Sequence, residues 1–379
     1  MTTSIADIDG LERGLLTGSP LGRRWARRML LDKLQDLDRG RLRLIDSRGS
    51  SVIGSARGAE ECEATIHVHD PRFWPKVLFG GSIGASEAYM AGLWSASDLR
   101  EALRFFLINR EAMDRLEAGA GTLFAPFNRL RQALRTNSKR GSRSNIKAHY
   151  DLSNDFFEIF LDRHMMYSSA VFTDAEGRDL GEDLEAATEA KLDRICRKAE
   201  LGPEDHVLEI GTGWGGFAVW AASRYGCRVT TTTISPEQYG AAVARVRRHG
   251  LEERVTVLQK DYRDLEGSFD KLISIEMIEA VGHDRLDDYF RVCAERLKPG
   301  GRMVLQGITI ADRLYARYRE SVDFIQRYVF PGSALPSVSA ISASLARSGD
   351  LQIVHLEDIG PHYARTLAAW RQRFFDRLD

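Results

Sequence analysis

The stretch Val207-Leu208-Glu209-Ile210-Gly211-Thr212-Gly213-Trp214-Gly215-Gly216 decides the fold of this chain. A short apolar run ends near a carboxylate, a glycine-rich turn follows, and an amphipathic segment starts at Phe217. A strand, a glycine loop and a helix start in this order form a site where backbone N–H groups approach a ligand closely. The sequence therefore predicts a domain that binds a nucleotide-type cofactor around residue 211.

The glycine loop fits either NAD or S-adenosylmethionine, and the end of the second strand and Glu209 distinguish the two cofactors. Gly211, Gly213 and Gly216 satisfy the Gly-x-Gly-x-x-Gly pattern of NAD-binding folds. Those folds usually carry an Asp or Glu at the end of the second strand, which here (228–233) ends in threonines instead. Glu209, just before the first glycine, suits a cofactor with an ammonium group. These residues favour S-adenosylmethionine, and NAD stays possible on the loop alone.

The second half of the chain alternates strand and helix patterns. This alternation predicts an α/β fold with a doubly wound, mostly parallel, Rossmann-like sheet. After the second strand, Ser235 is expected to cap a helix, with Pro236 as its first residue and Gln238 as the capping-box partner. Strands are expected near 206–210, 228–233, 254–258, 270–275, 302–308 and 351–356.

An aromatic-rich insertion, 309–336, interrupts this alternation after the strand that carries Gln306. Because ligands bind beyond the carboxyl ends of such strands, the insertion is predicted to be a lid or a substrate wall. Ordinary helical core packing is the alternative.

The length of 379 residues is enough for two domains. We expect a smaller, mainly helical N-terminal domain over 1–118, a basic linker over 119–144 and the cofactor domain over 145–379. The linker prediction rests on the absence of Asp and Glu between Ala118 and Tyr150, where arginines and lysines accumulate. A helix at 21–37 also mixes apolar residues with arginines, which suits either a membrane interface or ordinary packing. A strand is expected at 64–69.

Composition limits the partners. The net charge of −1 gives no global field that would attract nucleic acid, so no nucleic-acid partner is predicted. The four cysteines are far apart, which predicts neither a metal site nor disulfides and suits a cytoplasmic location. We recognise no signal peptide and no membrane span in the sequence. A protein of this kind that acts on lipid would work peripherally, at the inner face of the cell membrane.

A set of segments along the chain forms a recognisable pattern together with the glycine loop and Glu279: 70–73, 80–84, 87–90, 145–157, 166–170, 233–238, 260–265, 269–274, 328–332 and 360–367. By these segments the chain resembles the cyclopropane-fatty-acid synthase family, which includes the mycolic acid cyclopropane synthases. The match covers roughly residues 60–379, and several of its motifs are rare outside the family.

The resemblance implies a methyltransferase that adds the sulfonium methyl of S-adenosylmethionine to the double bond of an unsaturated phospholipid acyl chain, forming a cyclopropane. An alkene is a weak nucleophile, so catalysis must rest on positioning and on stabilising a carbocation. Aromatic faces can stabilise that cation without capturing it. Tyr167, Tyr328 and Tyr363 are the candidates in the matched segments, and Glu279 can orient a base.

In the family a bound bicarbonate is believed to act as the base, and this chain departs from the family's pocket for it. Cys and His usually stand where this sequence has Ser169 and Gln306, while Glu279, Ile308 and Tyr363 match. Ser and Gln still donate hydrogen bonds, but Gln cannot take a positive charge. Either bicarbonate binds in a modified pocket and a ring forms, which we predict, or a methyl- or methylene-branched chain results.

Two functions outside this reading stay open: a methyltransferase for soluble acceptors, and a catalytically weakened lipid-binding protein. Glu276 and Glu279 are three residues apart and can share a helical face, but only Glu279 has support from the family pattern. The two-domain relatives suggest a homodimer through the N-terminal domain. By the resemblance, and for Glu209 by charge, the cofactor-binding residues are Tyr167, Ser168, Glu209, Gly211, Gly213, Thr233, Ile234, Gln238, Asp261 and Tyr262.

Overall fold

The computed structural model describes residues 19–55, 62–113 and 153–378. The chain divides into two compact units, Met1–Leu134 with Ser321–Phe324, and Arg135–Glu320 with Ile325–Asp379. The predicted linker 119–144 lies outside the described residues, so the domain boundaries at 118 and 144 stay predictions. We describe each unit by itself.

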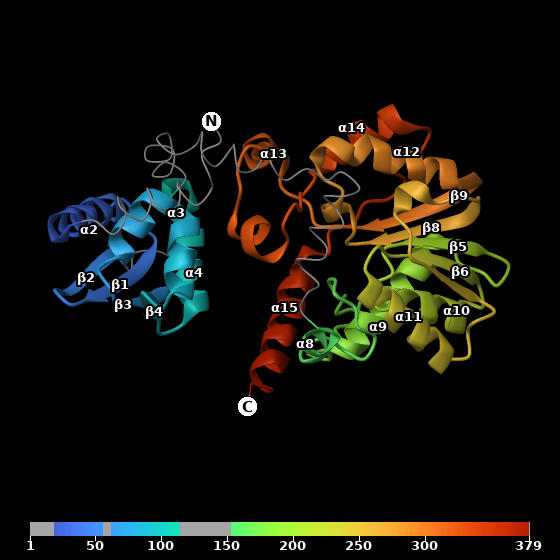
Figure 1. Ribbon diagram of the computed structural model, residues 1–379, viewed down its shortest axis with the longest axis horizontal. Helices are drawn as coiled ribbons and strands as arrows, with labels where there is room; N and C mark the ends of the chain where they lie inside the picture. The colour runs from blue at the N-terminus through green and yellow to red at the C-terminus, as the bar shows by residue number, and fades with distance from the viewer. Residues whose placement is uncertain (1–18, 56–61, 114–152, 379) are drawn as a thin grey trace, which may run out of the picture. The chain divides into compact units, whose positions relative to one another are not determined.

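Unit 1 combines helices with a small mixed sheet (Figure 1). Strand β1 pairs antiparallel with β2 and parallel with β3, and β3 pairs antiparallel with β4, which gives the order β2-β1-β3-β4. Helices make up most of its regular structure, as predicted, but only β3 of the four strands was predicted. Its elements are α2 (Pro20–Leu34), β1 (Gly40–Asp46), β2 (Gly49–Ser55), β3 (Glu63–Val68), α3 (Phe73–Met90), β4 (Trp94–Ala96) and α4 (Leu99–Ile108).

Unit 2 is built on a five-stranded parallel sheet of order β7-β6-β5-β8-β9. The first strand in chain order lies in the middle, and the winding direction reverses between β5 and β8. The predicted doubly wound α/β fold is therefore confirmed. Its strands are β5 (His206–Ile210), β6 (Arg228–Thr232), β7 (Val255–Leu258), β8 (Phe269–Ile275) and β9 (Leu297–Gln306).

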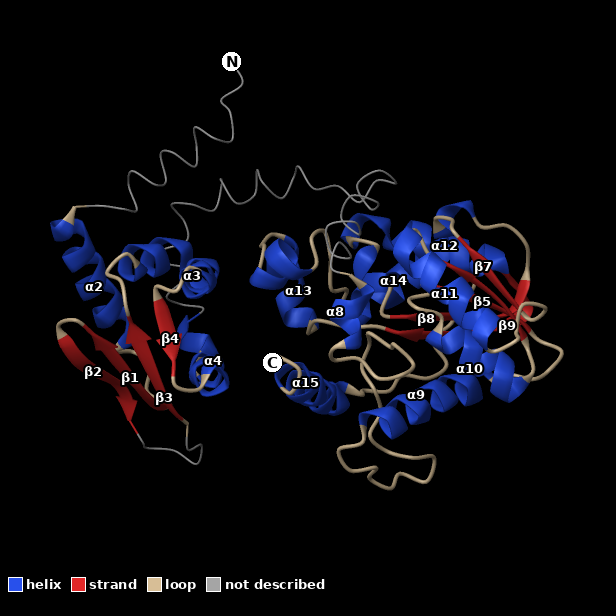
Figure 2. Ribbon diagram, turned by 60° about the horizontal axis from the view of Figure 1, so that its bottom comes forward, coloured by secondary structure: helices blue, strands red, loops and turns tan. Residues whose placement is uncertain are grey.

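Helices cover both faces of this sheet (Figures 1 and 2). Neighbouring residues of β5 show why, because Val207 packs in one apolar core and Leu208 in the other. Strand side chains alternate between faces, so a strand that is apolar at successive positions must be covered twice. The helices of unit 2 are α8 (Asn154–Glu158), α9 (Leu184–Ala199), α10 (Gly216–Tyr225), α11 (Pro236–Arg248), α12 (Leu286–Arg296), α13 (Asp312–Arg319), α14 (Val338–Ser348) and α15 (Gly360–Phe375), with short 3-10 turns η2 (Tyr262–Asp264), η3 (Ile278–Ala280) and η4 (His283–Arg285) and a π-helical turn η5 (Ile325–Val329).

The strand predicted at 351–356 was wrong. Residues 351–359 have no regular structure, and Val354 is 83% exposed. The apolar alternation suggested a strand, but a strand also needs a partner ladder and a covered face, and this segment has neither in the described structure. The strand predicted at 302–308 does form, as part of β9, and it ends at Gln306.

The predicted cap of α11 forms with one change. Ser235 Oγ accepts a hydrogen bond from Gln238 N at 3.2 Å, as expected for the N-cap. The Gln238 side chain does not return to Ser235 N, because its Oε1 accepts from Thr233 Oγ1 at 2.9 Å. Thr233 Oγ1 itself accepts from Ser235 N at 3.2 Å. The capping box is therefore closed through Thr233, which fixes the loop after β6.

Candidate active site

The predicted site residues that belong to the sheet and its loops lie at the carboxyl ends of the strands, around the point where the winding reverses between β5 and β8. The glycine loop follows β5, and Gly211 N and Thr212 N donate to Thr232 O at 3.1 and 3.0 Å. Gly213 has a left-handed φ of 51°, and a Cβ there would meet no atom within 4 Å. At Gly216 a Cβ would lie 2.4 Å from the His164 carbonyl oxygen. Gly213 therefore leaves open space for a ligand, and Gly216 allows the start of α10 to pack against the segment of His164.

Glu209 is buried within this edge, at 2% exposure. Thr231 Oγ1 donates to Glu209 Oε2 at 2.6 Å, and Thr212 Oγ1 lies 2.7 Å from Thr231 Oγ1. Burial raises the pKa of Glu209 to about 8, and the Thr231 hydrogen bond lowers it only in part. A ligand ammonium beside this carboxylate would offset the burial, so the loop fits a cationic cofactor such as S-adenosylmethionine.

Two further predicted cofactor residues follow β7. Asp261 is buried, and Arg263 Nη2 donates to its Oδ2 at 2.7 Å. Tyr262 lies edge-on to Tyr289 with ring centroids 5.5 Å apart, and burial raises its pKa to about 12. Together with Thr233, Gln238 and the half-buried Ile234 after β6, these residues extend the same carboxyl edge of the sheet.

A hydrogen-bonded cluster joins the ends of β8 and β9 to the segment around Ser169. Glu276 Oε1 accepts from Ser169 N at 2.8 Å and from Gln306 Nε2 at 2.8 Å. Gln306 Nε2 also donates to Ser169 O at 3.1 Å, and Ser169 Oγ donates to Ala170 O at 3.0 Å. Two of the predicted pocket residues, Ser169 and Gln306, are thus brought together by a residue that we did not select.

The prediction chose Glu279 and not Glu276; the choice of Glu279 stays a prediction, and the structure adds Glu276 to the cluster. Glu276 follows β8 directly with a left-handed φ of 49°, and the short turn η3 begins only at Ile278. The two glutamates therefore do not share a helical face. The available signal was position, because Glu276 stands just past the carboxyl end of a central strand, where ligands collect in such sheets.

Glu279 lies beside this cluster and binds a different donor. Its Oε1 accepts from Ile308 N, whereas its Oε2 is buried with no hydrogen-bond partner in the described part of the chain. Burial and the charge of Glu276 raise the pKa of Glu279 to about 8. The backbone carbonyl of Glu279 accepts from Ala334 N at 2.8 Å, which ties the predicted insertion to the site.

Lys191 is a second residue that the sequence analysis missed. It is buried on α9, and its Nζ donates to Ser168 Oγ at 2.7 Å. Burial lowers the pKa of Lys191 to about 8, against the charges of Glu276 and Asp162, which raise it. Its signal was present, because Lys191 continues the buried stripe of Leu184, Thr188 and Ile195 at helical spacing.

Aromatic rings line the same region. The Tyr167 ring centroid lies 5.3 Å from Trp370 and 6.0 Å from Phe330. Tyr363 lies 6.4 Å from Trp370, and burial followed by the charge of Glu276 raises its pKa. Tyr328, the third predicted ring, is 42% exposed on η5. The insertion therefore contacts Tyr167 through Phe330. Phe330 lies in segment 328–332, which resembles the family, but it was not among the predicted site residues.

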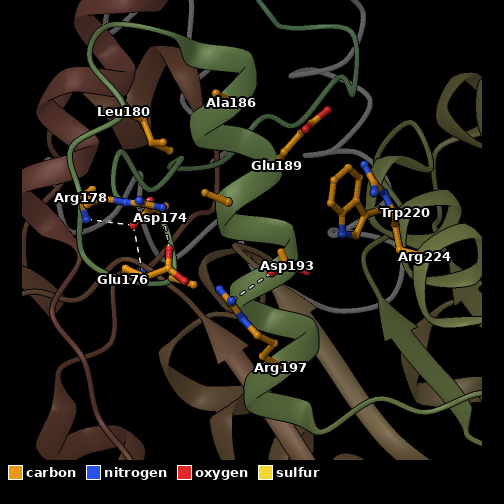
Figure 3. A pocket seen from close by; sticks show the side chains of 12 residues that line it. Asp174, Glu176, Arg178, Leu180, Ala186, Glu189, Asp193, Arg197, Trp220 and Arg224 are labelled. Carbon is orange, nitrogen blue, oxygen red and sulfur yellow. Dashed lines mark hydrogen bonds and ion pairs between the residues drawn. The ribbon is translucent and has the colours of Figure 1, made fainter.

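A surface hollow of about 460 Å³ lies along α9 and contains none of the predicted site residues (Figure 3). Its charged side chains pair with each other: Arg178 Nε lies 2.7 Å from Asp174 Oδ2, and Arg197 Nη1 lies 3.3 Å from Asp193 Oδ2. Arg224 stacks over the Trp220 ring at 4.8 Å. We therefore place the active site at the sheet edge and not in this hollow.

Comparison with known proteins agrees with this site. The chain is 38% identical over 331 residues to tuberculostearic acid methyltransferase UfaA1 of Mycobacterium tuberculosis, covering 86% of this chain and 77% of that protein. It is 38% identical over 339 residues to the cyclopropane-fatty-acyl-phospholipid synthase of Escherichia coli, covering 87% and 80%. The structure of the cyclopropane synthase MmaA2 from Mycobacterium tuberculosis has a TM-score of 0.56 and 29% identity, covering 62% of this chain and 83% of that one. That of mycolic acid cyclopropane synthase CmaA1 with SAH and CTAB has a TM-score of 0.55 and 29% identity, covering 61% and 82%.

Fold, loop and site together define a methyltransferase that uses S-adenosylmethionine, which removes NAD as an alternative. Residues 137–379 match the family model described as mycolic acid cyclopropane synthetase, and the chain belongs to this family. Its function is the transfer of a methyl carbon from S-adenosylmethionine to an unsaturated acyl chain, the chemistry by which this family forms cyclopropane fatty acids.

Proposed function

We propose that the enzyme acts on phospholipids at a membrane surface and converts the cis double bond of an acyl chain into a cyclopropane. The observation that carries this proposal is the cluster at the sheet edge, where aromatic rings and buried carboxylates lie together. Tyr167, Tyr363 and Phe330 offer π faces, while Glu276 and Glu279 offer oxygens. Such a lining suits a carbocation intermediate, because it attracts positive charge.

The cofactor side of the site is assigned to the predicted residues. S-adenosylmethionine supplies the electrophilic methyl group when it is bound. Glu209 would hold its ammonium group, because this carboxylate is buried and no cation of the described residues stabilises it. Gly211 and Gly213 keep the loop open. Further cofactor contacts are assigned to residues that follow β6 and β7 and to two residues of the segment before α9. They are Thr233, Ile234, Gln238, Asp261 and Tyr262, with Tyr167 and Ser168.

The acyl side is assigned to Tyr167, Tyr328 and Tyr363, whose faces would stabilise positive charge. Ser169, Gln306 and Ile308 would hold the carboxylates in place, because their N–H groups already donate to them. Glu279 would orient this network from η3. None of these roles needs a nucleophile that could capture the cation.

A helix face in unit 1 supports peripheral membrane binding from the cytoplasmic side. Leu21, Arg24, Trp25 and Arg28 lie at helical spacing on α2 and are all exposed, with Trp25 at 52%. The Trp25 ring stacks on Phe79, with centroids 6.3 Å apart. Apolar rings beside arginines suit an anionic lipid interface. A homodimer through the N-terminal domain belongs to this proposal as well.

Within the described residues, every helix is too short or too polar to serve as a candidate membrane span. The proposed membrane contact rests on the exposed face of α2. Trp25→Ala should weaken binding to anionic vesicles in a sedimentation assay several-fold or more. Moving an exposed aromatic side chain from water into the interface contributes about 1–3 kcal/mol to binding. Val52→Ala, another exposed apolar residue of unit 1, is the control. Equal binding by both variants would contradict the docking face.

The test of function is direct. The protein is incubated with methyl-labelled S-adenosylmethionine and vesicles of an unsaturated phospholipid, and the acyl chains are analysed by mass spectrometry. Label should enter unsaturated chains and not saturated ones. Label in soluble acceptors without any dependence on vesicles would favour the soluble-acceptor methyltransferase. Vesicle binding without transfer of label would favour a weakened lipid-binding protein.

A branched product is the second candidate, supported by Ser169 and Gln306 and by the similarity to a protein named tuberculostearic acid methyltransferase. Loss of a proton without ring closure leaves an alkene, which hydrogenates easily, whereas a methyl branch and a ring differ in mass. Replacing Ser169 by Cys together with Gln306 by His should shift the ratio towards the ring. An unchanged ratio would remove the argument that this pocket controls the product.

A further inference from the structure

The pocket expected to hold bicarbonate does not fit that anion in this protein. Within the described residues, the N–H groups that the pocket offers from Ser169, Gln306 and Ile308 already donate to carboxylates of the chain itself. Ser169 N and Gln306 Nε2 donate to Glu276 Oε1 at 2.8 Å each, and Ile308 N donates to Glu279. Ser169 Oγ donates to Ala170 O. An incoming anion would have to displace these bonds next to two glutamates.

We propose that Glu276 is the catalytic base of this enzyme, and that its carboxylate stands in for the bound bicarbonate of the family. This inference rests on the proposed function. The base is thereby part of the chain, held by two N–H donors that would otherwise bind a small anion.

The backbone conformation of Glu276 supports a functional role for this residue. Its φ of 49° is left-handed, a conformation that is strained for a residue with a side chain. Strain of this kind persists where the surrounding structure fixes it, often at functional sites. Here Glu276 N donates to Gln306 O at 2.8 Å, so the backbone and the side chain of Glu276 both bind Gln306.

Among the two glutamates, the environment favours Glu276 as the charged one. Burial raises the pKa of Glu276, and the hydrogen bonds from Ser169 and Gln306 and the charge of Lys191 offset this rise in part. Glu279 has one backbone donor from Ile308, and the charge of Glu276 raises its pKa further. When the surroundings set the pKa values of two neighbouring carboxyl groups apart in this way, the group with more donors to its charged form acts as the base and the other stays protonated.

The chemical step balances without an outside reagent. The π electrons of the alkene form a bond to the methyl carbon, the C–S bond of the methyl donor breaks, and the neighbouring alkene carbon becomes a cation. Glu276 then takes a proton from the new methyl group. The electron pair of that C–H bond closes the ring onto the cationic carbon, and Glu276 is left as a carboxylic acid. Alternatively, a hydride first moves from the carbon that carries the new methyl group to the neighbouring cation. Glu276 then takes a proton from the methyl group, the C–H electron pair forms a double bond between the methyl carbon and the carbon that carries it, and a methylene branch results.

The experiment measures labelled lipid in buffer purged of carbon dioxide, with and without added bicarbonate. We expect wild-type turnover to be unaffected by bicarbonate. Glu276→Gln keeps the acceptor oxygen for Ser169 N but cannot take the proton, so turnover should fall by about 100-fold or more, within the range for loss of a general base. The KM for S-adenosylmethionine should change little, which a merely destabilised site would not show.

Glu276→Gly gives a rescue test. Glycine suits the left-handed backbone and frees Ser169 N and the Gln306 amide for an external anion. This variant should be as slow as Glu276→Gln without bicarbonate and should regain part of its activity when bicarbonate is added. Glu295→Gln, an exposed carboxylate on α12 paired with Arg291, is the matched control and should keep wild-type activity.

Two results would overturn the role of Glu276: a wild type that needs added bicarbonate, or a Glu276→Gln variant that keeps turnover within about threefold of wild type, since loss of a general base costs far more. Failure of the wild type to label any lipid is a different result and would contradict the proposed function itself. Thermal melting of each variant identifies misfolding. If Glu276→Gly does not fold, the bicarbonate response of the wild type and the Glu276→Gln rate decide the question.

Discussion

Strands β5 and β8 are neighbours in the same sheet, and each delivers a buried glutamate to the same edge, yet the two glutamates differ in their partners. Glu209 receives one hydroxyl hydrogen bond, from Thr231. Glu276 receives two N–H hydrogen bonds and lies near the charge of Lys191. In the described part of the chain, the Thr231 hydroxyl is what favours the Glu209 carboxylate, which therefore suits binding of a cation. Two N–H donors and Lys191 favour the Glu276 carboxylate and offset part of its burial, which suits proton transfer. Donors, and not burial, separate the two roles.

The backbones at these strand ends differ in a related way. Gly213, after β5, and Glu276, after β8, share a left-handed conformation, with φ of 51° and 49°. At the first position glycine adopts it without strain and leaves room for a ligand. At the second the strain is retained together with a side chain. At this edge, the end of β5 is shaped by the missing side chain of Gly213 and the end of β8 by the side chain of Glu276.

The largest expected effect separates the two glutamates by kinetics. Glu276→Gln should lower kcat by about 100-fold or more with little change in KM, because only the proton transfer is lost. Glu209→Gln should raise the KM for S-adenosylmethionine about tenfold with kcat nearly unchanged, since a charge-assisted contact is worth about 1.4 kcal/mol or more. Steady-state assays over a range of cofactor concentrations measure both. The same pattern in the two variants would break the comparison.

The second effect tests the two glycines of the loop through stability. Gly216→Ala should lower the free energy of unfolding by about 2 kcal/mol or more, because its Cβ would lie 2.4 Å from the His164 carbonyl oxygen. Gly213→Ala should cost about 1 kcal/mol, from its left-handed backbone alone.

Chemical denaturation measures both values. The Gly213→Ala variant should also raise the KM for S-adenosylmethionine, because the added methyl group enters the open space before the loop. A Gly213→Ala variant with normal cofactor binding would show that the ligand lies elsewhere.

The smallest effect is a pH dependence that belongs to Glu209. Burial raises its pKa from 4.5 to about 8, so between these pH values Glu209 is protonated in the ligand-free folded protein and ionised in the unfolded chain. A cationic ligand favours the carboxylate, so affinity should rise with pH up to about 8, by at most about tenfold per pH unit, and then level off.

Without ligand the sign is opposite: this group's contribution to stability falls as pH rises from 4.5 to about 8. Titration calorimetry of wild type and Glu209→Gln, compared at each pH, cancels the titration of the ligand's own amino group. Parallel pH curves for the two proteins would show that Glu209 does not titrate with ligand binding.

Much of unit 2 followed from local sequence. The glycine loop, the cap at Ser235 and five strand positions were predicted, because each depends on residues close together in the chain. The strand at 351–356 was predicted wrongly, since pairing and cover are not local properties. Among the strands of unit 1 only β3 was predicted, and β1 was overlooked although it alternates too: Leu42 and Leu44 are buried, whereas Arg41 and Arg43 are exposed.

The sequence by itself determined the sheet, the methyl donor and the family, since the loop around Gly211 and the motifs along the chain are contiguous. Only the tertiary structure brought Ser169, Lys191, Glu276 and Gln306 to one place. These residues come from four segments separated by up to 137 positions, and no local pattern links them. The partners of a buried carboxylate decide its charge, and the fold alone chooses those partners.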